Sequence, residues 1–321
     1  MTHNGYIKRL PASEYHSQNR GGRGVRAMST REEDYVETVF TASSHDYILF
    51  FTSTGRVYRK KGYQLPEASR ASRGSPIVNF IPLETGEKVQ AMLHVRELEG
   101  ERYIFFATEN GTVKRMRLEE LKNIRTSGIR ALTLDEGDQL ISVSLTEGGE
   151  KILMATAKGM AICFEETDVR AMGRTAMGVR GIKLRGGDKV VGAGCALAGH
   201  MVLSVTENGF GKRTPVEEYL RGDAVQKRGG FGMKNYTVTE KTGAVADMKI
   251  VTGEEDMLIV SNDGTMIRTD VGSVSVYGRA AQGVRVMRPT EGSRVISVAC
   301  TEKAEEEPEE GTSDESGETE Q

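Results

Sequence analysis

The feature that most constrains the fold is a unit of about 50 residues that occurs six times along the chain. Each unit contains a glycine, preceded in five units by a strand-like apolar run, and a second glycine in constant phase. The first set is Gly5, Gly55, Gly111, Gly159, Gly209 and Gly264. The second set is Gly24, Gly74, Gly128, Gly178, Gly232 and Gly283. Repeats of this length indicate an array of similar supersecondary units that stack against one another.

The units read as β-structure. The apolar runs have strand length, and 38 glycines with only 7 prolines favour many tight turns. Further β-rich segments close each unit, for example 88–95 and 189–194, whereas the best helical candidate, 119–123, is a single short turn. Six all-β units favour radial closure, which leaves few exposed strand edges. We therefore predict an all-β, propeller-like domain of six blades with about four strands each.

The first unit and the end of the chain depart from this pattern. No apolar run precedes Gly5, so we expect blade 1 to lack its first strand and the chain to be cut from a longer polypeptide. The final 18 residues, 304–321, hold nine acidic residues and no basic one, so we expect a disordered acidic tail after a domain of residues 1–303. Residues 1–303 contain 43 basic and 37 acidic residues. This domain is therefore cationic, although the whole chain has a net charge of −3.

Several function classes find no support in the sequence. No apolar run is long enough to span a membrane, and no signal peptide is visible. Three distant cysteines in apolar surroundings indicate buried, reduced thiols of a cytoplasmic protein. The five histidines lack metal-ligand spacing, and 209–214 matches only half of a phosphate-binding P-loop. We predict no catalytic residue, no metal site and no cofactor in this chain.

Basic residues recur at two positions of the unit. Four residues after the first glycine, the first ladder consists of Arg9, Arg59, Arg115, Cys163, Arg213 and Arg268. Two residues after the second glycine, the second ladder consists of Arg26, Pro76, Arg130, Arg180, Lys234 and Arg285. The other basic residues predicted on the rim are Lys8, Lys60, Lys114, Lys212, Lys227 and Arg228. The arginines either pair with carboxylates inside the blades or form a belt for nucleic-acid phosphates.

The most concentrated candidate site is the run Gln18–Asn19–Arg20–Gly21–Gly22–Arg23–Gly24. Its glycines allow positive φ and close backbone approach, successive N–H groups can cradle an anion, and guanidinium forks suit phosphate oxygens. A solvated basic turn or a disordered RNA-binding segment remains an alternative.

The belt favours duplex DNA as the partner. No aromatic platform for stacked single strands accompanies it, and contacts to phosphates position a duplex without reading its sequence. Double-stranded DNA that follows the edge of a closed disc must bend strongly, and six units would spread the contacts along its path. We expect the acidic tail to compete with DNA for the belt.

These residues together resemble the family of C-terminal domains of the DNA gyrase A subunit. The run from Gln18 to Gly24 is similar to that family's seven-residue box, Gln-basic-Arg-Gly-Gly-basic-Gly, and departs from it at Asn19. The six repeats match the family over residues 1–303. A weaker copy of the box lies at Gln226–Gly232, where Phe231 replaces the second basic residue.

The resemblance implies a six-bladed β-pinwheel, which differs from a true propeller in strand connection. It also implies right-handed wrapping of DNA around the basic rim, so that the whole gyrase introduces negative supercoils. The implied partners are duplex DNA and, within gyrase, the B subunit together with the N-terminal core of the A subunit; ATP and Mg²⁺ are used only by the complete enzyme. The isolated domain is expected to be a monomer in the cytoplasm, at the nucleoid.

Two alternatives stay open. The related topoisomerase IV A subunit has a similar domain with an eroded box and fewer blades. A protein-binding propeller similar to the chromatin-associated exchange factors would instead present an interaction face. The intact box favours gyrase.

Overall fold

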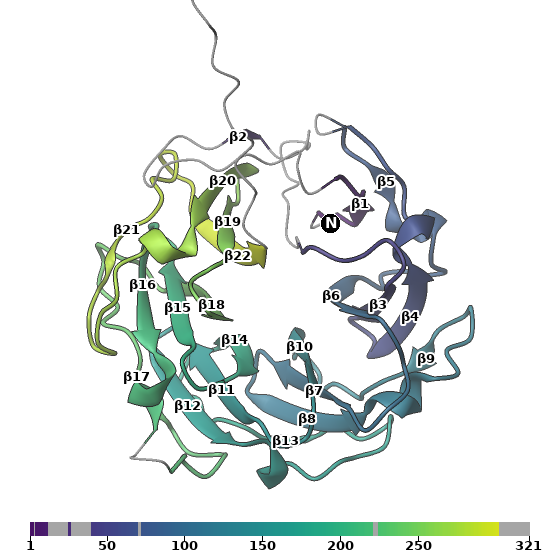
Figure 1. Ribbon diagram of the computed structural model, residues 1–321, viewed down its shortest axis with the longest axis horizontal. Helices are drawn as coiled ribbons and strands as arrows, with labels where there is room; N and C mark the ends of the chain where they lie inside the picture. Colours follow the sequence, from purple (N-terminus) through teal and green to yellow (C-terminus); the bar gives the residue numbers. More distant parts are fainter. Residues whose placement is uncertain (3, 12–24, 27–39, 70–71, 221–223, 302–321) are drawn as a thin grey trace, which may run out of the picture.

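The computed structural model describes residues 1–2, 4–11, 25–26, 40–69, 72–220 and 224–301, with the side chains of Val25, Arg26 and Thr301 excepted. Short antiparallel sheets follow one another around a common centre, and each sheet runs from that centre to the periphery (Figure 1). The all-β, propeller-like prediction is confirmed.

Five sheets have four strands, which run in order from the innermost to the outermost. The first two are β6 (Val89–Val95), β3 (Tyr47–Thr52), β4 (Arg56–Lys61), β9 (Ile129–Arg130), and β10 (Leu140–Thr146), β7 (Tyr103–Thr108), β8 (Thr112–Arg117), β13 (Val179–Arg180). The next two are β14 (Val190–Cys195), β11 (Lys151–Thr156), β12 (Met160–Glu165), β17 (Met233–Lys234), and β18 (Val245–Val251), β15 (Met201–Thr206), β16 (Phe210–Pro215), β21 (Val284–Arg285). The last is β22 (Val295–Thr301), β19 (Asp256–Ser261), β20 (Thr265–Asp270), β2 (Val25–Arg26).

The prediction of six four-stranded blades is corrected, because the described residues form five such blades. In the described part of the chain the sixth sheet has two strands, β1 (Tyr6–Ile7) and β5 (Ser75–Pro76). The first unit supplies β1 to this sheet and sends β2 to the sheet of the last unit, where Val25 pairs with Met266. The first unit thus contributes described strands to two different sheets.

The outermost strand of every sheet comes from the following unit. The two-residue strand β9 pairs with β4, β13 with β8, β17 with β12 and β21 with β16, and β2 of the first unit completes the circle on β20. This exchange is a change of strand connection that repeat spacing alone does not specify.

Short 3-10 turns link the second strand of most units to its outer segment. These turns are η2 (Gly62–Gln64), η4 (Leu118–Leu121), η5 (Glu166–Asp168), η6 (Val216–Tyr219) and η7 (Val271–Ser273), whereas η3 (Ile77–Asn79) follows the outer strand β5. The helical turn expected at 119–123 corresponds to η4. None of these helices has the length or apolar character to span a membrane, and the described residues contain no other candidate.

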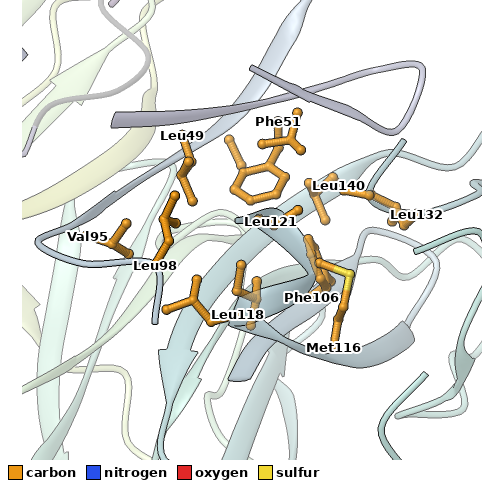
Figure 2. Close-up of a cluster of buried hydrophobic side chains, with 14 residues drawn as sticks. Leu49, Phe51, Val95, Leu98, Phe106, Met116, Leu118, Leu121, Leu132 and Leu140 are labelled. Carbon is orange, nitrogen blue, oxygen red and sulfur yellow. The ribbon is translucent and has the colours of Figure 1, made fainter. Parts of the chain in front are cut away.

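The core lies between neighbouring blades. Both faces of each central strand are covered, which explains why these strands are almost continuously apolar. In β3, Leu49 and Phe51 pack toward β7 of the next blade, where Phe51 meets Phe106 edge-on at 5.4 Å (Figure 2). On the opposite face of the same strand, Phe50 packs against a cluster that includes Ile7 of the first unit. Alternate residues of β3 thus pack against the units before and after their own, so that three successive units share one core.

Candidate nucleic-acid interface

The second ladder lies on the outermost strands. Arg130, Arg180, Lys234 and Arg285 are exposed and occupy the same place on β9, β13, β17 and β21. The labels of these strands mark the periphery of the ring in Figure 1. Arg26 occupies the equivalent position on β2, and Pro76 interrupts the ladder on β5. Four blades in succession therefore present one cation each at their outer edge.

The two recurrent glycines hold the outer strand in place, as the blade of β12 illustrates. The Gly159 carbonyl, in the hairpin turn, accepts hydrogen bonds from the N–H groups of Asn235 and Tyr236, just after β17. Gly232, just before β17, has φ of +74°, and a Cβ there would lie 2.1 Å from the Ala161 carbonyl oxygen. A side chain is excluded on both counts. The glycine phase thus fixes where the second-ladder cation emerges.

The first ladder is largely committed to contacts within the protein. Arg268 is 6% exposed and pairs with buried Asp256 on the neighbouring strand, with Nε 2.8 Å from Oδ2. Arg213 donates from Nε to the Val274 carbonyl at 2.7 Å and from a terminal nitrogen to the Gly272 carbonyl at 2.8 Å. The prediction that Arg268 lies on a DNA-binding rim is wrong, because its guanidinium is turned into its own blade.

The remaining first-ladder arginines also contact protein groups. Arg9 pairs with Glu67 at 2.6 Å, and Arg115 lies 3.9 Å from buried Glu166. Arg59 lies over the Tyr47 ring, 5.0 Å from its centroid. The buried Cys163 takes the fourth place in the ladder. The alternative that these arginines hold the blades together therefore describes the first ladder better than a phosphate belt does.

Two lysines predicted on the rim are buried. Lys114 donates from Nζ to the carbonyls of Ala131 and Arg174, both at 2.7 Å. Lys212 donates to those of Asn235 and Gly278, both at 2.8 Å. Burial lowers the pKa of each ammonium to about 8. Both predictions are corrected, because the ammonium groups are surrounded by the carbonyls of two successive units.

A sequence signal for these buried lysines exists. They stand three residues after the first glycine, as does Lys8, which donates to the carbonyls of Ser69 and Ser72 at 2.9 Å each. In the other three units the same position holds Tyr58, Ile162 or Ile267. Large apolar residues in half of the copies indicate that the position faces inward.

The weaker copy of the box lies beside β13. Arg228 donates to the carbonyls of Asp168 and Arg180, at 2.9 and 3.0 Å. Lys227 is well exposed and pairs with Asp168 at 3.0 Å. Lys60, on β4, is half-buried. The run from Gln18 to Gly24 lies outside the described residues, so its role as a DNA-binding box stays a prediction, as does that of the tail.

The described residues contain no group of three His, Cys, Asp or Glu side chains that could hold a metal ion. Cys163, Cys195 and Cys300 are free, and burial raises the pKa of each thiol to about 12. Cys163 is buried as predicted, whereas Cys195 and Cys300 are half-buried. Such thiols are poor nucleophiles.

Comparison with known proteins gives a consistent picture. The family described as "DNA gyrase C-terminal domain, beta-propeller" matches six successive segments, at residues 1–43, 46–96, 102–147, 150–196, 200–252 and 255–302. The DNA gyrase A subunit of Staphylococcus epidermidis strain ATCC 12228 is 50% identical over 302 residues, which cover 93% of this chain and 33% of that protein. The corresponding protein of Staphylococcus aureus strain NCTC 8325 is 50% identical over 311 residues, covering 96% and 35%. The chain thus spans about a third of the length of these relatives.

Two solved structures share the architecture. A DNA gyrase A C-terminal domain superposes with a TM-score of 0.83 at 27% identity, covering 94% of this chain and 98% of that one. The C-terminal domain of a DNA topoisomerase IV superposes with a TM-score of 0.73 at 24% identity, covering 94% and 91%.

Proposed function

We propose that this chain, which belongs to the family of DNA gyrase C-terminal domains, binds duplex DNA along its outer edge and bends it there, with no catalytic step of its own. The observation that carries the proposal is the second ladder. Arg130, Arg180, Lys234 and Arg285 are exposed at equivalent places on four successive outer strands. Charges spaced along a curved edge suit a continuous polyanion, and a bent duplex can touch them in turn.

Bending follows from the shape of the edge. A straight duplex can touch a convex rim at one place only, so contacts to several blades require the DNA to curve. Smooth bending of a short site costs about 1–6 kcal/mol, which several phosphate contacts can offset. Since phosphate contacts do not read sequence, we expect weak sequence preference.

In the complete enzyme, the bent segment would be presented to the N-terminal core of the A subunit for passage. ATP-driven passage of a wrapped segment would introduce negative supercoils, and only the complete enzyme, which includes the B subunit, would use ATP and Mg²⁺. The isolated chain would act as a monomer in the cytoplasm and need no cofactor. The box from Gln18 to Gly24 would be the anchor of the wrap on the first unit, and the acidic tail would compete with DNA for the rim.

Two measurements test the proposal. Titration with duplex DNA at several salt concentrations should give an affinity that falls steeply as salt rises, because bound counterions are released. Ligation of nicked circular DNA in the presence of the chain should leave a change in linking number. Absent binding would contradict DNA binding and favour a protein-binding propeller, whereas salt-independent binding would contradict the contacts to phosphates. Binding with unchanged linking number would contradict wrapping and favour the weaker, steering role expected of a topoisomerase IV-type domain.

A further inference from the structure

Two cations lie on one aromatic ring where the fourth and fifth units meet. The Lys183 ammonium is 4.9 Å from the centroid of the Phe231 ring, and the Arg185 guanidinium carbon is 4.8 Å from it. Phe231 is 39% exposed and lies just before β17, whereas Lys183 and Arg185 are exposed on the loop that follows β13. The negative face of an aromatic ring attracts cations. Loops from two successive units thus present a pair of positive charges on one surface.

Backbone hydrogen bonds fix these two loops to each other. The Lys183 N–H donates to the Gly230 carbonyl at 2.7 Å, and the Gly229 N–H donates to the Gly181 carbonyl at 2.6 Å. The Phe231 ring is therefore held beside the two cations. Because the ring already restrains both side chains, they lose less conformational freedom when they bind a ligand than unrestrained side chains would.

The protein does not neutralise the two cations. Within the described part of the chain, the side chains of Lys183 and Arg185 form no ion pair and donate no hydrogen bond. Lys189, at the end of the same loop, instead pairs with Glu109 at 2.8 Å. Exposed Arg180 on β13 adds a further charge near the start of the loop. Positive charges that lack a carboxylate partner favour an anionic ligand, and phosphate oxygens accept charge-assisted hydrogen bonds from both kinds of side chain.

The pair of cations is particular to the fourth unit. Lys183 and Arg185 stand five and seven residues after the second glycine of that unit, and no other unit has cations at both positions. The equivalent pairs are Ser29 and Arg31, Asn79 and Ile81, Thr133 and Asp135, Thr237 and Thr239, and Arg288 and Thr290. Phe231 occupies the place that Arg23 has in the first unit. The weaker copy of the box thus lacks a cation of its own at this place and receives two from the preceding unit.

Resting on the function proposed above, we propose that Lys183 and Arg185, stacked on Phe231, form a phosphate clamp that binds the DNA backbone at the fourth unit. The Arg185 guanidinium has a fork of donors that suits two phosphate oxygens, and the Lys183 ammonium adds a compact charge. The strand β13, which precedes these cations, lies across the ring from β2 of the first unit (Figure 1). A phosphate contact there keeps the duplex against the rim over half of the circle, so the clamp determines how far the DNA bends.

The test uses the 321-residue chain, with affinity for duplex DNA measured at several salt concentrations and linking number measured after ligation of nicked circles. Lys183→Gln/Arg185→Gln should reduce the slope of log affinity against log salt by about 2, because two phosphate contacts are lost. The linking-number change should fall about twofold, since the duplex is no longer held on the far half of the ring.

Phe231→Leu separates the ring from the charges. This variant keeps both cations, so the slope of log affinity against log salt should stay as in the wild type. Its affinity for DNA should fall about two- to tenfold, because the two side chains must then be ordered when DNA binds. An unchanged affinity would contradict the role of the ring in the clamp.

Lys122→Gln/Lys189→Gln is the matched control, with the same change in charge. Both lysines are exposed but already paired, Lys122 with Glu99 at 2.9 Å and Lys189 with Glu109 at 2.8 Å. This variant should keep the wild-type slope and linking number. An equal loss in the control would assign the effect to net charge and overturn the clamp.

The failure of the clamp and the failure of the proposed function give different results. An unchanged slope in Lys183→Gln/Arg185→Gln, in a chain whose wild type binds and wraps DNA, would overturn the clamp and favour an acidic protein segment as the ligand of these cations. A wild-type chain that neither binds DNA nor changes its linking number would instead overturn the proposed function itself.

Discussion

The two ladders have the same period and nearly the same residue type, yet they lie in different environments. Arg268 of the first ladder is enclosed by its blade and paired with Asp256, whereas Arg285 of the second ladder is exposed on an outer strand. Arg268 follows a hairpin glycine and lies on an inner strand of its blade. Arg285 lies on an outermost strand, which the next unit contributes to the sheet. A cation that recurs at one position shows that the position is important in most units. Whether its side chain is buried or exposed then decides whether it stabilises the fold or is free to bind a ligand.

The largest expected effect comes from removing the buried partner of the first ladder. Arg268→Met should lower the free energy of unfolding by about 3–5 kcal/mol, because the carboxylate of Asp256 stays buried without its guanidinium. Urea unfolding measures this. Arg285→Ala, the matched change in the second ladder, should cost less than about 0.5 kcal/mol. Similar losses at both sites would remove the distinction between the ladders.

The second ladder should dominate the response of DNA binding to salt. Replacing Arg130, Arg180, Lys234 and Arg285 with Gln should reduce the slope of log affinity against log salt by about 3 to 4, since each phosphate contact contributes about 0.9. Fluorescence anisotropy at several salt concentrations measures it. Arg268→Met, under conditions where it remains folded, should keep the wild-type slope. A quadruple variant with an unchanged slope would show that DNA lies elsewhere.

The buried lysines should act on stability rather than on DNA. Lys114→Met leaves the carbonyls of Ala131 and Arg174 without their donor, so we expect a loss of about 1–3 kcal/mol in the free energy of unfolding. Lys234→Met makes the same chemical change at an exposed position, where the expected loss is below about 0.5 kcal/mol. Thermal unfolding of the two variants compares them, and an unchanged stability of Lys114→Met would contradict a stabilising role for the two hydrogen bonds of Lys114.

The last prediction concerns the pH dependence of stability. Burial lowers the pKa of Lys114 and Lys212 to about 8, so between pH 8 and the higher pKa of the unfolded chain the unfolded state binds more protons. Stability should therefore rise as pH increases above 8, by at most about 1.4 kcal/mol per pH unit for each lysine. Unfolding midpoints at about pH 7.5 and 9.5 measure the rise, and the Lys114→Met/Lys212→Met variant should lack it. An equal rise in that variant would assign it to other groups.

The sequence predicts the architecture well because its signal has a steric cause. Gly159 and Gly232 recur in phase since a side chain at either would meet the backbone of the neighbouring strand, so the repeat of glycines reports the repeat of strands. The glycine spacing does not predict the strand exchange. Met233 could pair with a strand of its own unit or with Ala161 of the preceding unit, and the spacing of the glycines would be the same.

The interface was harder to predict than the fold. Lys114 and Arg130 are both cations at recurrent positions, and their difference in burial arises from the path of a loop contributed by the next unit. The residue types at equivalent positions of other units distinguish the two cases. The unit after that of Lys114 has Ile162 at the same position, whereas the unit after that of Arg130 has Arg180. Exchange for an apolar residue indicates an inward position, and exchange among cations indicates a common polar environment.

Arginine modification by phenylglyoxal, read by mass spectrometry with and without duplex DNA, tests the division between the ladders most directly. The account predicts that Arg130, Arg180 and Arg285 react in the free chain and are protected by DNA, while Arg268 reacts in neither state. Ready modification of Arg268 that DNA suppresses, together with unchanged reactivity of the three outer arginines, would contradict it.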